Sequence, residues 1–425
     1  MKILVLGAGR MGLGAAYDLA HNAEGVAAIT VADLDLERAR AVVSTVGSAK
    51  LTPAQVDVGD SAQVVGLMRG HDAVISCVTY YHNLQLARAA IEARVSFCDL
   101  GGNNTVVASE LALDAEARAA GINIIPDCGL APGMVSVLAA HGAARFDELE
   151  AIHIRVGGLP QQPRPPLNYQ IVFSVEGLIN EYVERARVIR GGQIVEVESL
   201  TEIEALEFPA PYGRMEAFQT SGGTSTLPDT FQGRLQELDY KTIRYPGHCE
   251  RFRLLVDLGL TSSEEIEVGG VRTTPRRVLG EMLLRRLPAD EPDVVLIRVE
   301  FRGMLATRGD RPMRQPVEAG QVGAEEPEKN TFRNPVREAT GEEPSTGGRT
   351  ATLVYDIIDR FDQSTGLSAM MRTTAFPASI IAQMMARGEI DGKGAIPQER
   401  SVPPEAFVRE LAKRNILIEE RVIEA

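Results

Sequence analysis

The chain has 425 residues, of which 44% are hydrophobic and 24% are charged, and this length predicts two or three globular domains. The formal net charge of −14 argues against nucleic acid or an anionic membrane as a partner, because both require basic surfaces. No apolar run approaches the ~20 residues of a membrane span, no cleavable leader is evident, and the four cysteines have no CxxC spacing. We therefore expect a cytoplasmic protein with reduced thiols and without a metal site.

The first part of the chain alternates short apolar runs with amphipathic segments. The expected strands are Lys2–Leu6, Ala28–Asp33, Gln55–Val58, Asp72–Val78, Val95–Leu100 and Ile122–Pro126. The expected helices are Arg10–Asn22, Asp35–Val46, Ser61–Met68, Asn83–Ala93 and Ser109–Ala120. Strands that are apolar on both faces and alternate with helices are typical of a doubly wound parallel sheet. This pattern predicts an α/β fold with a Rossmann domain over residues 1–130.

The second part lacks this alternation and predicts an α+β substrate-binding and dimerisation domain over residues 131–370. The expected strands are Leu149–Gly157, Arg187–Ile189, Gln193–Val197, Lys241–Tyr245, Val294–Arg302 and Ala351–Ile358. With few crossover helices between them, they favour an antiparallel or mixed sheet. The polar segment Thr307–Arg349 is predicted to be a long surface loop. Three elements are expected near the end: the helices Pro377–Arg387 and Pro404–Arg414, and the strand Ile416–Glu420.

A glycine-rich turn follows the first strand and opens the first helix. Its sequence GAGRMG places glycines at the positions needed for a tight turn, for close approach of a pyrophosphate and for helix–strand packing. Free N–H groups at the start of the helix would then face the phosphates. The sequence therefore predicts dinucleotide contacts at Gly7, Gly9, Arg10, Met11 and Gly12.

An acidic residue ends the second strand, 21 residues after the last glycine of the turn. A carboxylate at this position accepts hydrogen bonds from the adenosine ribose and repels a 2′-phosphate, so Asp33 favours NAD over NADP. Asp33 is also suited to cap the next helix, and the two roles are compatible. Asp57, which closes the third expected strand, is a weaker candidate for a contact on the adenine side.

Ligands of open α/β sheets bind beyond the carboxyl ends of the strands. Further cofactor contacts are expected there at Cys77, Val78, Thr79 and Leu100. The acid–base candidates at the same edge are Tyr81, His82 and Asp127. The alternative for His82 is a side chain that faces water at a helix start, and the alternative for Asp127, as for Asp99, is capping of backbone N–H groups. Buried cysteines serve more often as small apolar residues than as nucleophiles.

Longer motifs identify a family resemblance that covers nearly the whole chain. The stretches that carry it are DCGLAPGM (Asp127–Met134), VGGLPQQPRPPLNYQIVFSVEGLINEY (Val156–Tyr182), AFQTSGGTSTL (Ala217–Leu227), YKTIRYPGH (Tyr240–His248), FRLLVDLGL (Phe252–Leu260), TATLVYD (Thr350–Asp356) and TTAFPASIIAQMMARGEIDGKGAIPQE (Thr373–Glu399). They resemble the saccharopine dehydrogenase family, and within it the branch of the lysine 6-dehydrogenases. Two departures favour that branch: Ala131 stands where saccharopine dehydrogenases typically have an acid, and Ser221–Thr224 replaces a polar and basic stretch.

The resemblance implies NAD-dependent oxidation of the ε-amine of L-lysine to the 6-semialdehyde, which cyclises to a piperideine carboxylate. It also implies a return of the segment 371–425 to the nucleotide domain and assembly into a homodimer or larger oligomer. The first alternative is a saccharopine dehydrogenase or a related reductive amine condensation. The second is an inactive protein that binds NAD. The amine must lose its proton before a hydride leaves, so an acceptor for that proton is required.

Substrate contacts are expected on the second domain. Arg244 is the predicted anchor of the α-carboxylate, because a guanidinium binds a carboxylate through two parallel hydrogen bonds; a surface charge is the alternative. Strand alternation places Thr242 and Arg244 on one face and Lys241 and Ile243 on the other. The other predicted substrate contacts are Glu176, Tyr169, Thr224 and His248.

Overall fold

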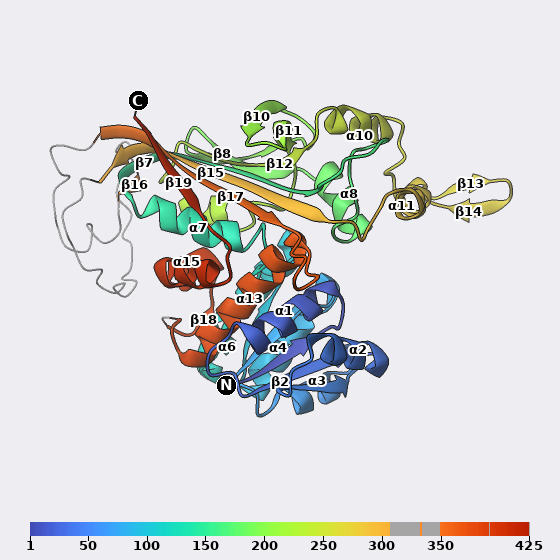
Figure 1. Ribbon diagram of the computed structural model, residues 1–425, viewed down its shortest axis with the longest axis vertical. Helices are drawn as coiled ribbons and strands as arrows, with labels where there is room; N and C mark the ends of the chain where they lie inside the picture. The colour runs from blue at the N-terminus through green and yellow to red at the C-terminus, as the bar shows by residue number, and fades with distance from the viewer. Residues whose placement is uncertain (307–331, 334–348, 391, 425) are drawn as a thin grey trace.

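The computed structural model describes residues 1–306, 332–333, 349–390 and 392–424, which form two large sheets with helices packed between and around them (Figure 1). The predicted loop Thr307–Arg349 lies outside the described residues, apart from Phe332, Arg333 and Arg349. None of the described helices is long and apolar enough to cross a lipid bilayer.

The first sheet has seven strands in the order β18-β6-β5-β4-β1-β2-β3, and all neighbours are parallel. The strands are β1 (Lys2–Leu6), β2 (Ala28–Asp33), β3 (Leu51–Gln55), β4 (Ala73–Ser76), β5 (Ser96–Asp99), β6 (Asn123–Ile125) and β18 (Gly394–Ala395). The order of the first six strands is that of a Rossmann fold. The predicted α/β class with a doubly wound parallel sheet is confirmed.

Helices cover both faces of this sheet. They are α1 (Arg10–His21), α2 (Leu36–Val46), α3 (Ser61–Met68), the short 3-10 turn η1 (Tyr80–His82), α4 (Asn83–Ala93), α5 (Asn104–Leu111) and α6 (Asp114–Ala120). Asp35, Asp60 and Asn103 each accept backbone N–H groups at the start of a helix, which satisfies donors that have no partner inside the helix.

Two element predictions in this part are wrong. The third strand is Leu51–Gln55 and not Gln55–Val58, because β3 is an edge strand, where a proline such as Pro53 is tolerated. The expected helix Ser109–Ala120 is two helices, because the Asn103 cap starts α5 earlier and Leu113 turns into the core at the break.

The second sheet is mixed, with ten strands along the path β10-β11-β12-β7-β15-β17-β19 and β8, β9 and β16 attached to it. Only the pair β12–β7 is parallel among its described pairs. The strands are β7 (Phe146–Pro160), β8 (Ala186–Arg190), β9 (Gln193–Val197), β10 (Glu204–Phe208), β11 (Gly213–Gln219), β12 (Glu237–Arg244), β15 (Asp293–Leu305), β16 (Phe332–Arg333), β17 (Arg349–Arg360) and β19 (Glu419–Glu424). The prediction of a mixed sheet is confirmed, whereas the last strand lies later than Ile416–Glu420. A ribbon of β13 (Ile266–Val268) and β14 (Val271–Thr273) projects from the body (Figure 1).

The helices of this second part are α7 (Met134–Ala143), α8 (Val175–Val183), α9 (Leu227–Phe231), α10 (His248–Asp257), α11 (Pro275–Arg286), α13 (Ala369–Arg387), α14 (Gln398–Ser401) and α15 (Pro404–Lys413). Helix α13 contacts α1, β4 and β5 as well as β15, and therefore packs between the two sheets (Figure 1). Its predicted start at Pro377 is wrong. The hydroxyl of Ser368 accepts the N–H of Met371 and starts the helix two turns earlier, and burial of nearly the whole helix offsets the bond that Pro377 cannot make.

Candidate functional site

The glycine turn between β1 and α1 has the geometry of a phosphate cradle. Gly7 has a φ of +97°, and a Cβ atom on Gly12 would lie 1.8 Å from the Gly7 carbonyl oxygen, so both positions require glycine. A Cβ atom on Gly9 would meet no protein atom within 4 Å. Helix α1 begins there without a side-chain cap, which leaves N–H groups of its first turn for an anion. These residues fit the pyrophosphate of a dinucleotide.

Asp33 and Arg10 lie beside this turn, and their side chains bond to different parts of the protein. Asp33 Oδ2 accepts the N–H of Ala8 at 2.7 Å, so the carboxylate at the end of β2 faces the turn. Arg10 Nη1 instead donates to the carbonyl of Ala289 at 2.9 Å, and the same nitrogen lies 3.7 Å from Asp290. The start of α1 is thus tied to the segment that leads into β15.

The other predicted cofactor residues follow neighbouring strand ends. The carbonyl of Cys77 would lie 2.8 Å from a Cβ atom on Gly7, so β4 ends against the turn. Val78, Leu100 and Met11 are half-buried near that edge, and Thr79 is exposed. Asp57 lies beyond the end of β3, is exposed, and accepts the N–H of Gly59 at 2.8 Å. Their contact with a cofactor stays a prediction.

Asp127 is held from both halves of the protein. It has a φ of +60°, and Gly101 packs against it so closely that a Cβ atom on Gly101 would lie 1.8 Å from Asp127 Oδ1. Its Oδ2 accepts the hydroxyl of Ser225, which belongs to the loop between β11 and α9 and has a φ of +41°. Two non-glycine residues with left-handed backbone meet at this contact, and such strain gathers at functional sites.

Three carboxyl groups are buried together at this strand edge. Burial raises the pKa of Asp99 to about 6, although N–H groups of Gly101 and Asp127 stabilise its anion. Burial and the charges of Asp99 and Asp127 raise the pKa of Glu110 to about 10. Burial and the charge of Asp99 raise the pKa of Asp127 to about 8, while Ser225 opposes the shift. Glu110 therefore keeps its proton at neutral pH, and Asp127 can exchange one.

Arg244 is buried on the second sheet, with only 2% of its surface exposed. Its Nε donates to the hydroxyl of Tyr182 at 2.8 Å and its Nη1 donates to the carbonyl of Ile243 at 2.9 Å. The guanidinium carbon lies 4.8 Å from the ring centre of Tyr169 and 5.8 Å from that of Tyr182. This is a preorganised cation between two aromatic faces, and not the surface charge that was the alternative.

His248 supports Arg244 from behind. Its Nδ1 lies 2.9 Å from the carbonyl of Leu167 and its Nε2 lies 3.0 Å from the hydroxyl of Tyr182. Because Nδ1 must donate to a carbonyl, Nε2 accepts from Tyr182, and burial together with the charge of Arg244 lowers the pKa of His248 to about 3. His248 is neutral, and both ring nitrogens are engaged within the protein, so its predicted direct substrate contact is not supported.

The remaining predicted residues are dispersed. Tyr81 is 69% exposed and its ring lies 4.1 Å from that of Tyr80, while His82 is half-buried at the end of the same turn. Thr224 donates to the carbonyl of Arg187 at 3.0 Å. Glu176 forms an exposed ion pair with an arginine of α11 and is not gathered with Arg244.

Four residues of this region were missed by the sequence analysis: Ser225, Glu110, Glu181 and Tyr182. Glu110 and Ser225 lie far from Asp127 in the chain, and only the packing of α5 and of the second sheet brings them there. Glu181 and Tyr182 end the long motif Val156–Tyr182, which could have drawn attention to them, but no local spacing links them to Arg244.

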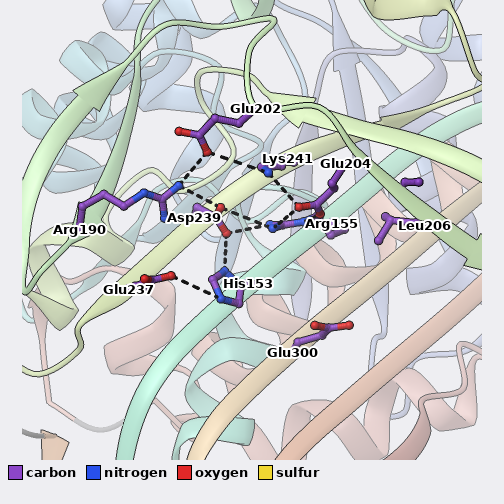
Figure 2. A pocket seen from close by; sticks show the side chains of 11 residues that line it. His153, Arg155, Arg190, Glu202, Glu204, Leu206, Glu237, Asp239, Lys241 and Glu300 are labelled. Carbon is purple, nitrogen blue, oxygen red and sulfur yellow. Dashed lines mark hydrogen bonds and ion pairs between the residues drawn. The ribbon is translucent and has the colours of Figure 1, made fainter.

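A cavity among the described residues lies elsewhere. It measures about 580 Å³, and Figure 2 shows cationic side chains gathered around Asp239 in it. Asp239 accepts from His153 Nδ1 at 2.7 Å and from Arg155 Nη1 at 2.8 Å, and Lys241 donates to Glu204 at 2.8 Å. Asp239 and Lys241 alternate with Arg244 along β12, so this cavity opens on the opposite face of the sheet, as the strand alternation predicted.

Comparison with known families matches both parts of the chain. The model described as saccharopine dehydrogenase NADP binding domain matches residues 3–125, and the model described as saccharopine dehydrogenase C-terminal domain matches residues 129–417. The chain belongs to the saccharopine dehydrogenase family. The family resemblance of the sequence motifs is confirmed, whereas the narrower likeness to lysine 6-dehydrogenases is not shown.

Relatives in the saccharopine dehydrogenase family cover different shares of the chain. Saccharopine dehydrogenase [NADP(+), L-glutamate-forming] of Schizosaccharomyces pombe is 23% identical over 93% of this chain and 94% of its own length. Mouse alpha-aminoadipic semialdehyde synthase is 25% identical over 81% of this chain, which spans only 40% of that longer protein. The solved saccharopine dehydrogenase (L-Glu forming) of Saccharomyces cerevisiae superimposes with a TM-score of 0.74 at 19% identity over 99% of both chains, which shows a shared fold.

Proposed function

We propose that this protein is a nicotinamide-dependent oxidoreductase that acts on a carbon–nitrogen bond of an amino-acid substrate, of the saccharopine dehydrogenase kind. The observation that carries the proposal is the contact of Asp127, which follows β6 of the sheet that carries the glycine turn, with Ser225 of a loop of the second sheet. The S. pombe relative, named as a saccharopine dehydrogenase and covered over 94% of its length, supports the same reaction class.

The chemistry requires a neutral amine, a hydride acceptor and a water that completes the cleavage. The cofactor, when bound beside the glycine turn, would supply the nicotinamide that takes up the hydride from the C–H bond next to nitrogen. The resulting imine takes up water and separates into an aldehyde and an amine. Asp127, whose pKa of about 8 lies near neutrality, accepts the proton that the amine must lose. Arg244 binds the substrate carboxylate.

The cofactor proposal differs from the expectation drawn from Asp33. The names of the matching nucleotide-domain family and of the S. pombe relative favour NADP over NAD, so NADP is the first cofactor to test. Asp33 would still oppose a 2′-phosphate by charge repulsion. We therefore expect Asp33→Asn to raise the ratio of kcat/KM for NADP to that for NAD at least about 10-fold. An unchanged ratio would show that the carboxylate does not face the ribose.

The division of the chain and its assembly complete the proposal. We propose a nucleotide domain of residues 1–130 with the return 371–425 and a substrate-binding and dimerisation domain of residues 131–370. Contacts of α13 with α1 and the pairing of β18 with β6 support the return, whereas β19 pairs with β17 in the second sheet. We also propose a homodimer or larger assembly, which light scattering of the purified protein measures directly.

Oxidative deamination of L-lysine remains the second candidate. It is favoured by Ala131 and by the uncharged stretch Ser221–Thr224, since a substrate without a glutamyl part needs fewer charged partners. Initial rates of reduced-nicotinamide formation with saccharopine and with L-lysine, each with NADP⁺ and NAD⁺, separate the two candidates. Turnover of saccharopine alone supports the first reaction, and turnover of lysine alone supports the second. Turnover of neither, in either direction, refutes the proposal.

A further inference from the structure

Two opposite charges, one on the second sheet and one on helix α8, lie near each other without a direct bond between them. Arg244 projects from β12, and Glu181 lies on α8 beside Tyr182, the residue that accepts the Arg244 Nε–H. The two charges interact through space, yet they form no ion pair within 4.0 Å. Among the described residues, no side chain or N–H group hydrogen-bonds the Glu181 carboxylate.

The guanidinium of Arg244 and the carboxylate of Glu181 therefore have hydrogen-bonding atoms without partners in the described part of the protein, in a region with little access to water. Arg244 is almost fully buried, and Glu181 is partly buried. Charges removed from water are costly unless they are paired and hydrogen-bonded. Tyr182 and Ile243 hold the guanidinium in place, and the backbone carbonyl of Glu181 accepts the N–H of Ser221 at 3.0 Å, which anchors this end of α8 to the loop after β11.

A fixed cation beside a carboxylate without a partner among the described residues is the complement of an α-amino acid, which carries a carboxylate and an ammonium group on one carbon. We propose that Glu181 and Arg244 together form the receptor for this zwitterionic group, with Arg244 on the carboxylate and Glu181 on the α-ammonium. The inference rests on the proposed function for its substrate class and makes Glu181 a specificity-determining residue.

The surrounding groups allow this role at neutral pH. Burial raises the pKa of Glu181 to about 7, although the charge of Arg244 opposes the shift, and a bound ammonium would favour the anion further. The titratable groups around the pair are Tyr182 of the same helix as Glu181, Tyr240 of the same strand as Arg244, and Tyr169 and His248 from other segments. The tyrosines keep their protons because burial raises the pKa of each, and His248 is neutral. Glu181 is thus the acid of this cluster that titrates near neutrality.

The test compares ligands that differ only in the α-amino group. Calorimetry at pH 8 in the presence of NADP⁺ measures the binding of L-lysine against 6-aminohexanoate, and of L-glutamate against glutarate. In the wild-type protein, loss of the α-amino group should weaken binding about 10- to 100-fold, the range of a charge-assisted hydrogen bond. In Glu181→Gln the same loss should cost less than about 3-fold.

The matched control is Glu184→Gln, which removes an exposed carboxylate at the end of the same helix and should keep the full preference for the α-amino group. A preference that survives in Glu181→Gln, or wild-type protein that binds neither amino acid, overturns the inference. Failure of the proposed reaction is seen separately, in the turnover assay. Amino-acid binding that depends on Glu181 would stand even if neither saccharopine nor lysine were oxidised.

Discussion

Glu110→Gln should make the protein more stable at alkaline pH. The folded protein holds the Glu110 proton up to a pKa of about 10, whereas the unfolded chain releases it near the ordinary value of 4.5. Between these pH values unfolding releases a proton, so stability falls as the pH rises. Each unit corresponds to about 1.4 kcal/mol, and between pH 5 and pH 8 the loss approaches about 4 kcal/mol. Glutamine keeps the shape of the side chain and removes this loss.

Chemical unfolding followed by circular dichroism at several pH values measures this effect. The stability difference between Glu110→Gln and wild type should be small at pH 5 and should grow towards pH 8. Glu116→Gln, on the exposed side of α6, is the control and should follow the wild type throughout. A Glu110→Gln protein that gains no stability between pH 5 and pH 8 would show that the buried carboxyl is not held in its protonated form.

Three further predictions test the site directly. Ser225→Ala removes the hydrogen bond that opposes the raised pKa of Asp127, so the corresponding limb of the pH–rate profile should move to higher pH; an unmoved profile would remove Asp127 from the acid–base chemistry. Gly9→Ala should leave the melting temperature within about 2 °C of wild type yet weaken dinucleotide binding more than about 10-fold in a fluorescence titration, because its Cβ atom meets no protein atom; equal binding would place the dinucleotide elsewhere. Tyr182→Phe leaves the Arg244 Nε–H without its acceptor and should raise KM for the carboxylate substrate about 10-fold with little change in kcat, whereas an unchanged KM would separate Arg244 from substrate binding.

The parallel sheet could be predicted from the sequence because its strands carry a local signal. Lys2–Leu6 and Ala28–Asp33 are apolar on both faces, and their bounds agree with β1 and β2. The turn Gly7–Gly12 also carries a local signal, because the φ of +97° at Gly7 and the close approach of Gly12 to the Gly7 carbonyl arise within six residues. Predictions failed where a distant partner decides the structure. Pro377 reads as a helix start, yet the burial of α13 between two sheets carries the helix through it.

The candidate site divides in the same way. Arg244 was predicted from its strand and its charge, but its supporting groups were not, because Tyr182 and His248 approach it from α8 and α10. His248 illustrates the difference: its place after a Pro-Gly turn indicated a side chain that faces the substrate, whereas the fold buries it as a neutral support of Tyr182. Residue type and spacing find groups with chemistry, and the packing decides which of them a ligand can reach.

One loop connects the two parts of the candidate site, the surroundings of Asp127 and the surroundings of Glu181 and Arg244. The segment that follows β11 bonds to the carbonyl of Glu181 through the N–H of Ser221 and to Asp127 through the hydroxyl of Ser225. A shift of this loop would therefore move the proposed receptor for the amino-acid group and the proposed proton acceptor together. In the proposed reaction a misplacement of the reacting carbon by about 1 Å would be costly, so this shared support gives a functional reason for the strain at the contact of Asp127 with Ser225.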